Sequence, residues 1–298
     1  MARVVYTHAR HRRTYSASVS WGCALSGARC PSRPPLLVLK NYFSANATSR
    51  QPAVPVRWFP LSVGDEFLRE LGAAPGRFAS PPRALGARPA AERPLLFSFA
   101  GSVQSNPRGR LRMVRVTRSQ PMAQLAEERL GLRALVQFSA LWDANYSAAA
   151  GYDGAREYRA VLGDSMFALV PGGHSPECFR LWEAIHAGAV PIVVFEDPLT
   201  GRKDAWFNCE DPLRPLLASG APLVALDSWD DLYAFFDKFK TAFDLQAWVD
   251  VRQRRMRHWV QEFEAGAAAR TLAALRRAAD ANRTAGRAAA AASPETAP

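Results

Sequence analysis

The chain has 298 residues, 48% of them hydrophobic, which is enough to bury a core in one large or two modest domains. Its 38 basic against 27 acidic residues give a formal net charge of +11, which favours an anionic partner such as nucleic acid, a membrane surface or a phosphorylated substrate. There is no run of about 18 apolar residues, so we expect no membrane span in this chain. The arginine-rich first residues also lack the apolar segment of a secretory signal.

The cysteines do not indicate a metal site, because none of the four belongs to a CxxC pair or to a zinc-ligand spacing. We expect Cys178 to be inert in a core helix. Cys209, which we place in a loop, is expected either to be inert or to pair in an oxidising lumen. Three Asn-x-Ser/Thr triplets, which would suit a lumenal protein, occur at Asn46, Asn145 and Asn282.

The first third of the chain predicts little regular structure. Residues 1–35 are rich in Arg and Ser without hydrophobic periodicity, so we expect them to be poorly ordered. Two strands, Leu36–Leu39 and Val54–Leu61, are then expected, followed by a helix over Asp65–Leu71. The stretch Pro75–Pro94, composed largely of Pro, Ala, Gly and Arg, has the composition of a linker.

From Pro94 onward, short apolar runs alternate with helical patterns, which is typical of a doubly wound parallel sheet of the α/β class. The expected strands are Pro94–Val103, Ala134–Leu141, Met166–Val170 and Pro222–Asp227. The expected helices are Arg156–Asp164, one that begins at Ser228 with a capping box to Asp231, and one from Ala242 to about Arg277. We expect residues 278–298 to be disordered.

The segment from Ser165 to Val194 carries the clearest functional signal. Its strand runs into Pro171, Gly172 and Gly173, where the chain can turn sharply and approach a ligand without side-chain obstruction. Ligands of open α/β sheets bind outside the carboxyl ends of the strands, where this turn is expected. The segment therefore predicts a phosphate-binding turn.

A helix is expected directly after this turn. Ser175 suits the N-cap, Pro176 the first helical position, and Glu177 complements the positive end of the helix dipole. The helix is expected to end at Gly188. Its N-terminal N–H groups would then face a bound phosphate.

Arg180 and Glu183 fall on one face of this helix, together with Ala184 and Ala187. One interpretation assigns Arg180 to a diphosphate and Glu183 to the two hydroxyls of a ribose. The other is a solvent-exposed ion pair, and spacing alone favours it.

Residues Pro171 to Val193 follow the pattern P-x-G-x-x-x-E-x-x-R-x-x-E-A-x-x-x-G-x-x-P-V, with Ile192 preceding the final valine. This pattern resembles that of the exostosin-like glycosyltransferases, and most of all their ribitol-5-phosphate xylosyltransferase branch. The stretch FSFAGS at Phe97–Ser102 resembles that branch as well. Further matching positions are Asn208, Cys209, Pro212, Leu213, Gly220, Ala221, Pro222 and Trp229.

The resemblance implies a two-lobed GT-B fold in which residues 93–262 form the donor nucleotide-sugar-binding C-terminal domain. Residues 36–92 would then be a short or truncated remnant of the N-terminal, acceptor-side lobe with its linker. A disordered basic segment at 1–35 and a helical, then disordered, Ala- and Arg-rich tail at 263–298 would flank them.

The resemblance also implies the reaction, which is an inverting transfer of xylose from UDP-xylose to ribitol phosphate or a related glycan acceptor in protein O-glycosylation. The UDP-sugar is a substrate, and neither a cofactor nor a metal is expected. The family places the enzyme in the Golgi lumen.

For the site, the resemblance favours a role of Arg180 and Glu183 in donor binding over a surface ion pair. Gly101 and Ser102 are expected to form a second wall of the donor cleft, with Arg108 reaching a phosphate and the arginines after it on a solvated helix face. The full predicted donor-binding set is Gly101, Ser102, Arg108, Pro171, Gly172, Gly173, Ser175, Glu177, Arg180 and Glu183.

An inverting transfer needs a catalytic base, for which Asp65, Glu66 and His174 are the nearby candidates, and none is assigned. The pair Asp230 and Asp231 lies at a helix start and is interpreted as a cap rather than a metal site. Two other functions stay open. One is a catalytically inactive nucleotide-sugar-binding remnant, and the other is a basic nucleic-acid-binding module, which the lack of aromatic residues among the basic runs disfavours.

Overall fold

The computed structural model describes residues 4–7, 37–40, 56–58, 88–103, 106–139, 155–173, 177–195, 205–206, 209–210 and 213–291. The chain divides into two compact units, one of Leu61–Phe263 and one of Met1–Pro60 with Glu264–Pro298. The helix expected over Asp65–Leu71 and most of the linker expected after it lie outside the described residues, as do Asn46 and Asn145.

The larger unit contains a five-stranded parallel sheet. Its strands are β4 (Leu95–Ser102), β5 (Arg133–Ser139), β6 (Ser165–Leu169), β7 (Val190–Val194) and β10 (Val224–Leu226). Their spatial order is β10-β7-β6-β4-β5, which is the Rossmann-like order 2-1-3-4-5 when the five strands are numbered along the chain. The predicted doubly wound parallel α/β sheet is therefore confirmed.

The central strands are apolar because helices cover both faces of the sheet. Every residue of β6 and β7 is buried, and so is every residue of β4 except Gly101. A strand that is buried on both faces needs a continuous apolar run rather than an alternating one. The runs LLFSFA and SMFAL meet that need, which is why the sequence predicts these strands correctly.

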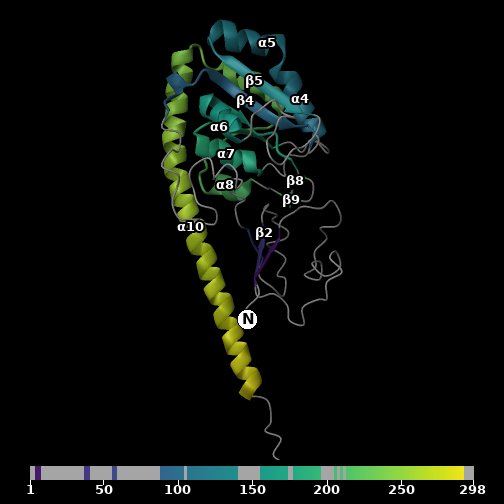
Figure 1. Ribbon diagram of the computed structural model, residues 1–298, viewed down its shortest axis with the longest axis vertical. Coiled ribbons are helices and arrows are strands. Elements are labelled where there is room, and N and C mark those ends of the chain that lie inside the picture. The colour runs from purple at the N-terminus through teal and green to yellow at the C-terminus, as the bar shows by residue number, and fades with distance from the viewer. Residues whose placement is uncertain are drawn as a thin grey trace, which may run out of the picture. The chain divides into compact units, whose positions relative to one another are not determined.

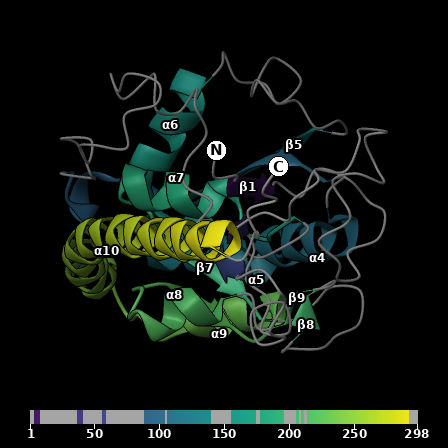
Figure 2. The same cartoon turned by 90° about the horizontal axis from the view of Figure 1, so that it is seen from below.

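Short helices connect the strands. They are α4 (Pro107–Thr117), α5 (Gln120–Ala123), a π-helical turn (Gln124–Arg129), α6 (Ala155–Asp164), α7 (Phe179–Ala187), α8 (Arg214–Ala218) and α9 (Leu232–Asp237). Helices α6 and α7 pack side by side, as Figures 1 and 2 show. Two surface ion pairs, Arg112–Asp230 and Arg129–Asp237, tie the connection between β4 and β5 to the segment after β10.

A ring cluster packs α9 and the start of α10 (Ala242–Ala291) against the sheet. The ring centroid of Phe167 in β6 lies 5.2 Å from that of Phe236 and 5.9 Å from that of Trp248. Phe97 of β4 stacks on Phe236 with centroids 5.8 Å apart. Such pairs each stabilise the fold by about 0.5–1.5 kcal/mol beyond their burial.

The capping box predicted at Ser228 is present. The Ser228 side chain accepts from the N–H of Asp230, and the Asp231 carboxylate accepts from the N–H of Ser228. The interpretation of the two aspartates as a cap holds fully for Asp231 only, because the carboxylate of Asp230 accepts from Arg112. That hydrogen bond lowers the pKa of Asp230.

Helix α10 is longer than the sequence predicts. It begins at Ala242 as expected but continues to Ala291, past the end expected near Arg277, since the Ala- and Arg-rich residues there are strong helix formers. Within the larger unit its indole Trp259 stacks on Trp182 of α7, with centroids 6.1 Å apart. No helix in the described part of the chain combines the length and the apolar character that a membrane crossing requires.

The smaller unit contains a parallel sheet of β1 (Val4–Thr7), β2 (Leu37–Lys40) and β3 (Val56–Trp58), in that spatial order. Strands β2 and β3 lie where the sequence predicts strands. Strand β1 falls in the segment 1–35 that was expected to be disordered, so that expectation is wrong for these four residues. The surrounding Arg- and Ser-rich residues show no hydrophobic periodicity, which hides the short apolar run of β1.

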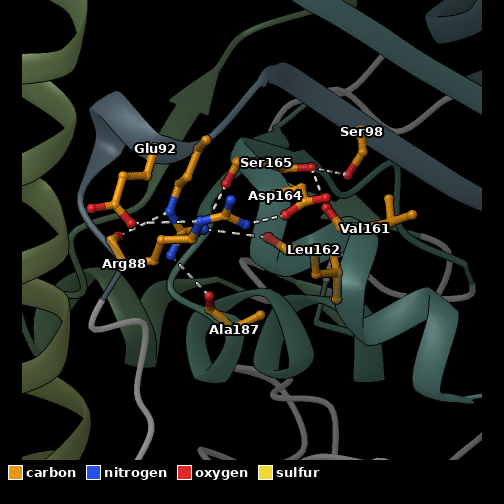
Figure 3. Close-up of polar contacts among 9 residues, drawn as sticks. Arg88, Glu92, Ser98, Val161, Leu162, Asp164, Ser165 and Ala187 are labelled. Atoms are coloured by element: carbon orange, nitrogen blue, oxygen red, sulfur yellow. Dashed lines mark hydrogen bonds and ion pairs between the residues drawn. The ribbon is translucent and has the colours of Figure 1, made fainter.

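One buried arginine joins several elements at the amino ends of the strands. Arg93, only 1% exposed, precedes β4 and donates through Nε to the carbonyl of Arg88 at 3.2 Å. Its Nη1 donates to the carbonyls of Leu162 at 3.4 Å and Ser165 at 2.8 Å, and its Nη2 to that of Ala187 at 3.1 Å. Figure 3 shows these carbonyls, which come from α6, β6 and α7, converging on one place.

The charge of Arg93 is stabilised there by helix ends. Leu162 lies in the last turn of α6, and Ala187 is the last residue of α7. Carbonyl groups at helix C-termini carry partial negative charge and lack partners within the helix. Burial, and next the charge of Arg88, nevertheless lower the pKa of Arg93 to about 10, which leaves it protonated at neutral pH.

We expect Arg93→Met to lower the free energy of unfolding by at least about 3 kcal/mol, because several buried carbonyls would lose their donor at about 1–3 kcal/mol each. Arg93→Lys should retain little of this stability, since an ammonium group cannot reproduce the planar arrangement of guanidinium donors. Urea denaturation measures both. The control Arg129→Met, which removes an exposed ion pair, should cost less than about 1 kcal/mol. Equal losses for Arg93→Met and the control would contradict the assignment.

Candidate functional site

The candidate site lies where the strand order reverses, between β4 and β6. These two strands are neighbours in the sheet but are followed by connections that lead in opposite directions, to β5 and to β7. Gly101 and Ser102 end β4, and Pro171–Gly173 follows β6. Such a switch point is where open α/β sheets bind ligands. The topology thus brings together two parts of the predicted set that are far apart in the sequence.

The turn after β6 has the conformation that its glycines permit. Gly172 adopts a left-handed backbone with φ of 66°, which a residue with a side chain rarely accepts. The carbonyl of Pro171 accepts from the side chain of Asn106 at 3.0 Å, and that of Gly172 accepts from Arg110. Donors therefore cover two carbonyl oxygens that would otherwise repel an anion.

The helix after this turn begins later than predicted. It starts at Phe179 with Cys178 as its N-cap and ends at Gly188, so the end is confirmed and the start near Ser175 is wrong. Ser175 itself lies outside the described residues. Glu177 lies ahead of the helix in non-helical backbone and is fully buried.

Cys178 is a free cysteine, but its predicted place inside a core helix is wrong, because it is the half-buried N-cap of α7. Burial raises the pKa of its thiol despite the nearby charge of Arg180, so the reactive thiolate is disfavoured. Cys209, which was expected in a loop, instead lies in β9 (Cys209–Glu210), paired antiparallel to β8 (Ala205–Trp206).

Arg180 lies over the carboxyl end of β4. Its Nη2 donates to the carbonyl of Ala100, and its Cζ lies 4.5 Å from the ring centroid of Phe99. A Cβ atom placed on Gly101 would lie 2.6 Å from Nη2 of Arg180, closer than such atoms approach. Gly101 thus leaves the space that the guanidinium group occupies.

A second guanidinium group, which the sequence analysis missed, lies at the same place. Arg110 is 8% exposed and donates to the carbonyls of Ser102 and Gly172, the latter at 2.7 Å from Nη2 and 3.1 Å from Nε. Its Cζ lies 5.8 Å from the ring centroid of Phe99, the ring that Arg180 also contacts. Burial, and next the charge of Arg180, lower the pKa of Arg110 to about 10.

The expectation that the arginines after Arg108 lie on a solvated face is wrong for Arg110. It shares a helix face with the buried residues Met113, Val114 and Thr117, so helical spacing counted from an N-cap at Asn106 would have identified it. Arg108, the predicted phosphate ligand, is exposed. Arg110 rather than Arg108 joins the two predicted loops.

Glu183 is 1% exposed, so the interpretation as a solvated ion pair is wrong. Its Oε2 accepts a hydrogen bond from the hydroxyl of Tyr158 in α6 at 3.0 Å. Tyr158 is buried too, and its ring centroid lies 5.8 Å from Cζ of Arg180. A short network therefore runs from α6 to α7 beneath Arg180.

The chemistry of the site is that of an anion receptor. Two guanidinium groups lie against one ring, and burial together with the charge of Arg180 lowers the pKa of Arg110. The described residues contain no group of three His, Cys, Asp or Glu side chains arranged to hold a metal ion. The arrangement thus suits a ligand with two negative charges, such as a diphosphate.

The fold is a Rossmann-like domain with two arginines at the switch point of its sheet. A family model, that of the RXYLT1 C-terminal domain, matches residues 86–278, and the chain belongs to this family. Residues 86–278 include the sheet, both arginines and most of α10. The family is one of glycosyltransferases.

Curated relatives carry the name ribitol-5-phosphate xylosyltransferase 1. The protein of Danio rerio is 29% identical over 174 residues, which are 58% of this chain and 36% of that relative. The protein of Mus musculus is 33% identical over 111 residues, and that of Homo sapiens 32% identical over 116 residues, each covering 37% of this chain and 24% of the relative. The matches thus span between about a quarter and a third of these relatives' length.

Gly101→Ala should displace the guanidinium group of Arg180, and it should lower the free energy of unfolding by no more than about 1 kcal/mol, because the clash is with the far end of a flexible side chain that can move aside. Gly163→Ala in α6 is the matched control. Nothing lies within 4 Å of its added Cβ, so it should stabilise the protein by about 0.5–1 kcal/mol. Chemical denaturation distinguishes the two, and equal effects would disprove the close approach at Gly101.

Proposed function

We propose that the domain binds the nucleotide diphosphate of a sugar donor and forms the donor-binding lobe of a GT-B glycosyltransferase. The observation that carries the proposal is the pair Arg110 and Arg180 at the carboxyl ends of β4 and β6. The switch point is the expected ligand position of this fold, and paired guanidinium groups recognise phosphate oxygens by bidentate hydrogen bonds.

Electrostatics supports a dianionic ligand. The hydrogen bonds of Arg110 go to carbonyl oxygens, which leave its positive charge in place. A diphosphate between the buried Arg110 and the half-buried Arg180 would replace a repulsion between two cations by two attractions. During transfer, the same cations would stabilise the negative charge that develops on the departing UDP.

The other predicted residues have different roles in this proposal. Gly172 and Gly173 let the phosphates approach the backbone, and Gly101 with Ser102 forms the opposite wall. Pro171 belongs to the same turn and Glu177 is fully buried, whereas Ser175 lies outside the described residues. Arg108, on the exposed side of α4, contributes long-range attraction only.

The relatives' name supports a proposal for the donor and the acceptor. A ribitol-5-phosphate xylosyltransferase joins xylose to ribitol phosphate, so we propose UDP-xylose as donor and ribitol phosphate or a related glycan as acceptor, with inversion at the sugar. The same kinship supports a role in protein O-glycosylation in the Golgi lumen. The candidate bases Asp65, Glu66 and His174 lie outside the described residues, and the proposal assigns none.

Binding of nucleic acid is less well supported. In the basic stretch Arg108–Arg118, Arg110 is buried, and Arg112 pairs with Asp230. Arg118 donates to the carbonyl of Val136. Most arginines of this stretch are therefore engaged within the fold.

We expect the protein to release UDP from UDP-xylose when a ribitol phosphate acceptor is present. The assay compares UDP-xylose with other UDP-sugars, each with and without acceptor. UDP binding without turnover would support the alternative of an inactive nucleotide-sugar-binding remnant. Failure to bind or turn over any nucleotide sugar would contradict the proposed function.

Arg180→Ala should weaken UDP binding by about 1.5–3 kcal/mol, the contribution of a charge-assisted hydrogen bond. Titration calorimetry gives the dissociation constant. Arg112→Ala removes one equal charge that pairs with Asp230 away from the site, and it should leave UDP affinity unchanged. If both variants bind UDP like the wild-type protein, Arg180 does not contact the diphosphate.

A further inference from the structure

Glu183 and Tyr158 form a buried pair that the proposed donor site does not explain. The carboxylate of Glu183 is 1% exposed and accepts from the Tyr158 hydroxyl at 3.0 Å. A carboxylate that binds the two hydroxyls of a ribose needs an open path to the ligand. Glu183 is instead enclosed in the fold, with one of its oxygens engaged by a neighbouring helix.

The pair connects directly to the proposed phosphate ligand Arg180. The ring centroid of Tyr158 lies 5.8 Å from Cζ of Arg180, and that of Phe99 lies 4.5 Å from it. Both rings are within the range of a cation–π contact, which is stronger when the groups are removed from water. Phe99 is held rigidly in the central strand β4, whereas Tyr158 depends on α6 and on its hydrogen bond to Glu183.

We propose that Tyr158 and Glu183 are positioning residues for Arg180. Glu183 holds the hydroxyl of Tyr158, and the ring of Tyr158 together with that of Phe99 fixes the guanidinium group above Gly101. Glu183 therefore acts on a bound diphosphate through Tyr158 and Arg180, and not as an acceptor for ribose hydroxyls. This inference rests on the proposed diphosphate site.

The two roles of Glu183 differ in which part of the nucleotide they affect. A ribose acceptor contributes to the affinity for UDP and uridine but not to that for inorganic pyrophosphate. A residue that positions Arg180 contributes equally to the affinities for UDP and pyrophosphate, and nothing to that for uridine. Titration calorimetry with the full chain and these three compounds therefore separates them.

Four variants make the test sharp. We expect Glu183→Leu and Tyr158→Leu to weaken the binding of pyrophosphate and of UDP by the same factor. That factor is about tenfold, as the loss of one desolvated cation–π contact implies. Glu183→Gln keeps an acceptor for the tyrosine hydroxyl and should restore binding to within about threefold of the wild-type protein. Tyr158→Phe keeps the ring without its hydrogen bond, so its affinities for pyrophosphate and UDP should lie between those of the leucine variants and that of Glu183→Gln.

Tyr233→Leu is the matched control, because it removes a tyrosine that is 37% exposed on α9, and it should leave all affinities unchanged. Circular dichroism confirms that each variant is folded. A loss of UDP affinity with unchanged pyrophosphate affinity in Glu183→Leu would overturn the inference in favour of ribose binding. Lowered thermal stability with unchanged affinities would reduce the pair to a structural role. If the wild-type protein does not bind pyrophosphate, the proposed diphosphate site itself is wrong.

Discussion

The structure of the larger unit depends on one buried guanidinium group. Arg93 donates to carbonyls of α6, β6 and α7, so the starts of the two central strands and the ends of two helices share one hydrogen-bonding centre. No apolar residue can take this place, because the carbonyls at helix ends need donors. The positions of α6 and α7 relative to the sheet follow from this centre, and with them the positions of Tyr158 and Arg180.

The arginines at the carboxyl ends of the strands have a different electrostatic environment from that of Arg93. Arg93 faces the C-terminal ends of two helices, whose partial negative charge stabilises it. Arg180 lies in the first turn of α7, where the helix dipole is positive, and its neighbour Arg110 is a second cation. Positive charge at the positive end of a helix dipole is unfavourable, and a bound anion would offset it. Arginine therefore stabilises the fold at the amino ends of the strands and forms the candidate binding site at their carboxyl ends.

Local patterns in the sequence predict the scaffold of the site well. The continuous apolar runs of β4 and β6, the glycines after β6 and the helix end at Gly188 each depend on neighbouring residues, and each was found. The start of α7 was placed too early because Ser175 and Pro176 fit the capping rules. Glu177 is instead fully buried in non-helical backbone, and its burial depends on distant residues that those rules do not include.

Local sequence patterns cannot predict which residues the site arginines contact, and the reason is physical. The bond from Arg180 to Ala100 spans 80 residues, and that from Arg110 to Gly172 spans 62. Both exist only because β4 and β6 are neighbours, an arrangement that follows from the strand order of the whole sheet. Composition therefore indicates an anionic partner and the motif indicates Arg180, whereas only the topology adds Arg110. The requirement for glycine at position 101 is of the same kind, since it is imposed by a side chain from α7.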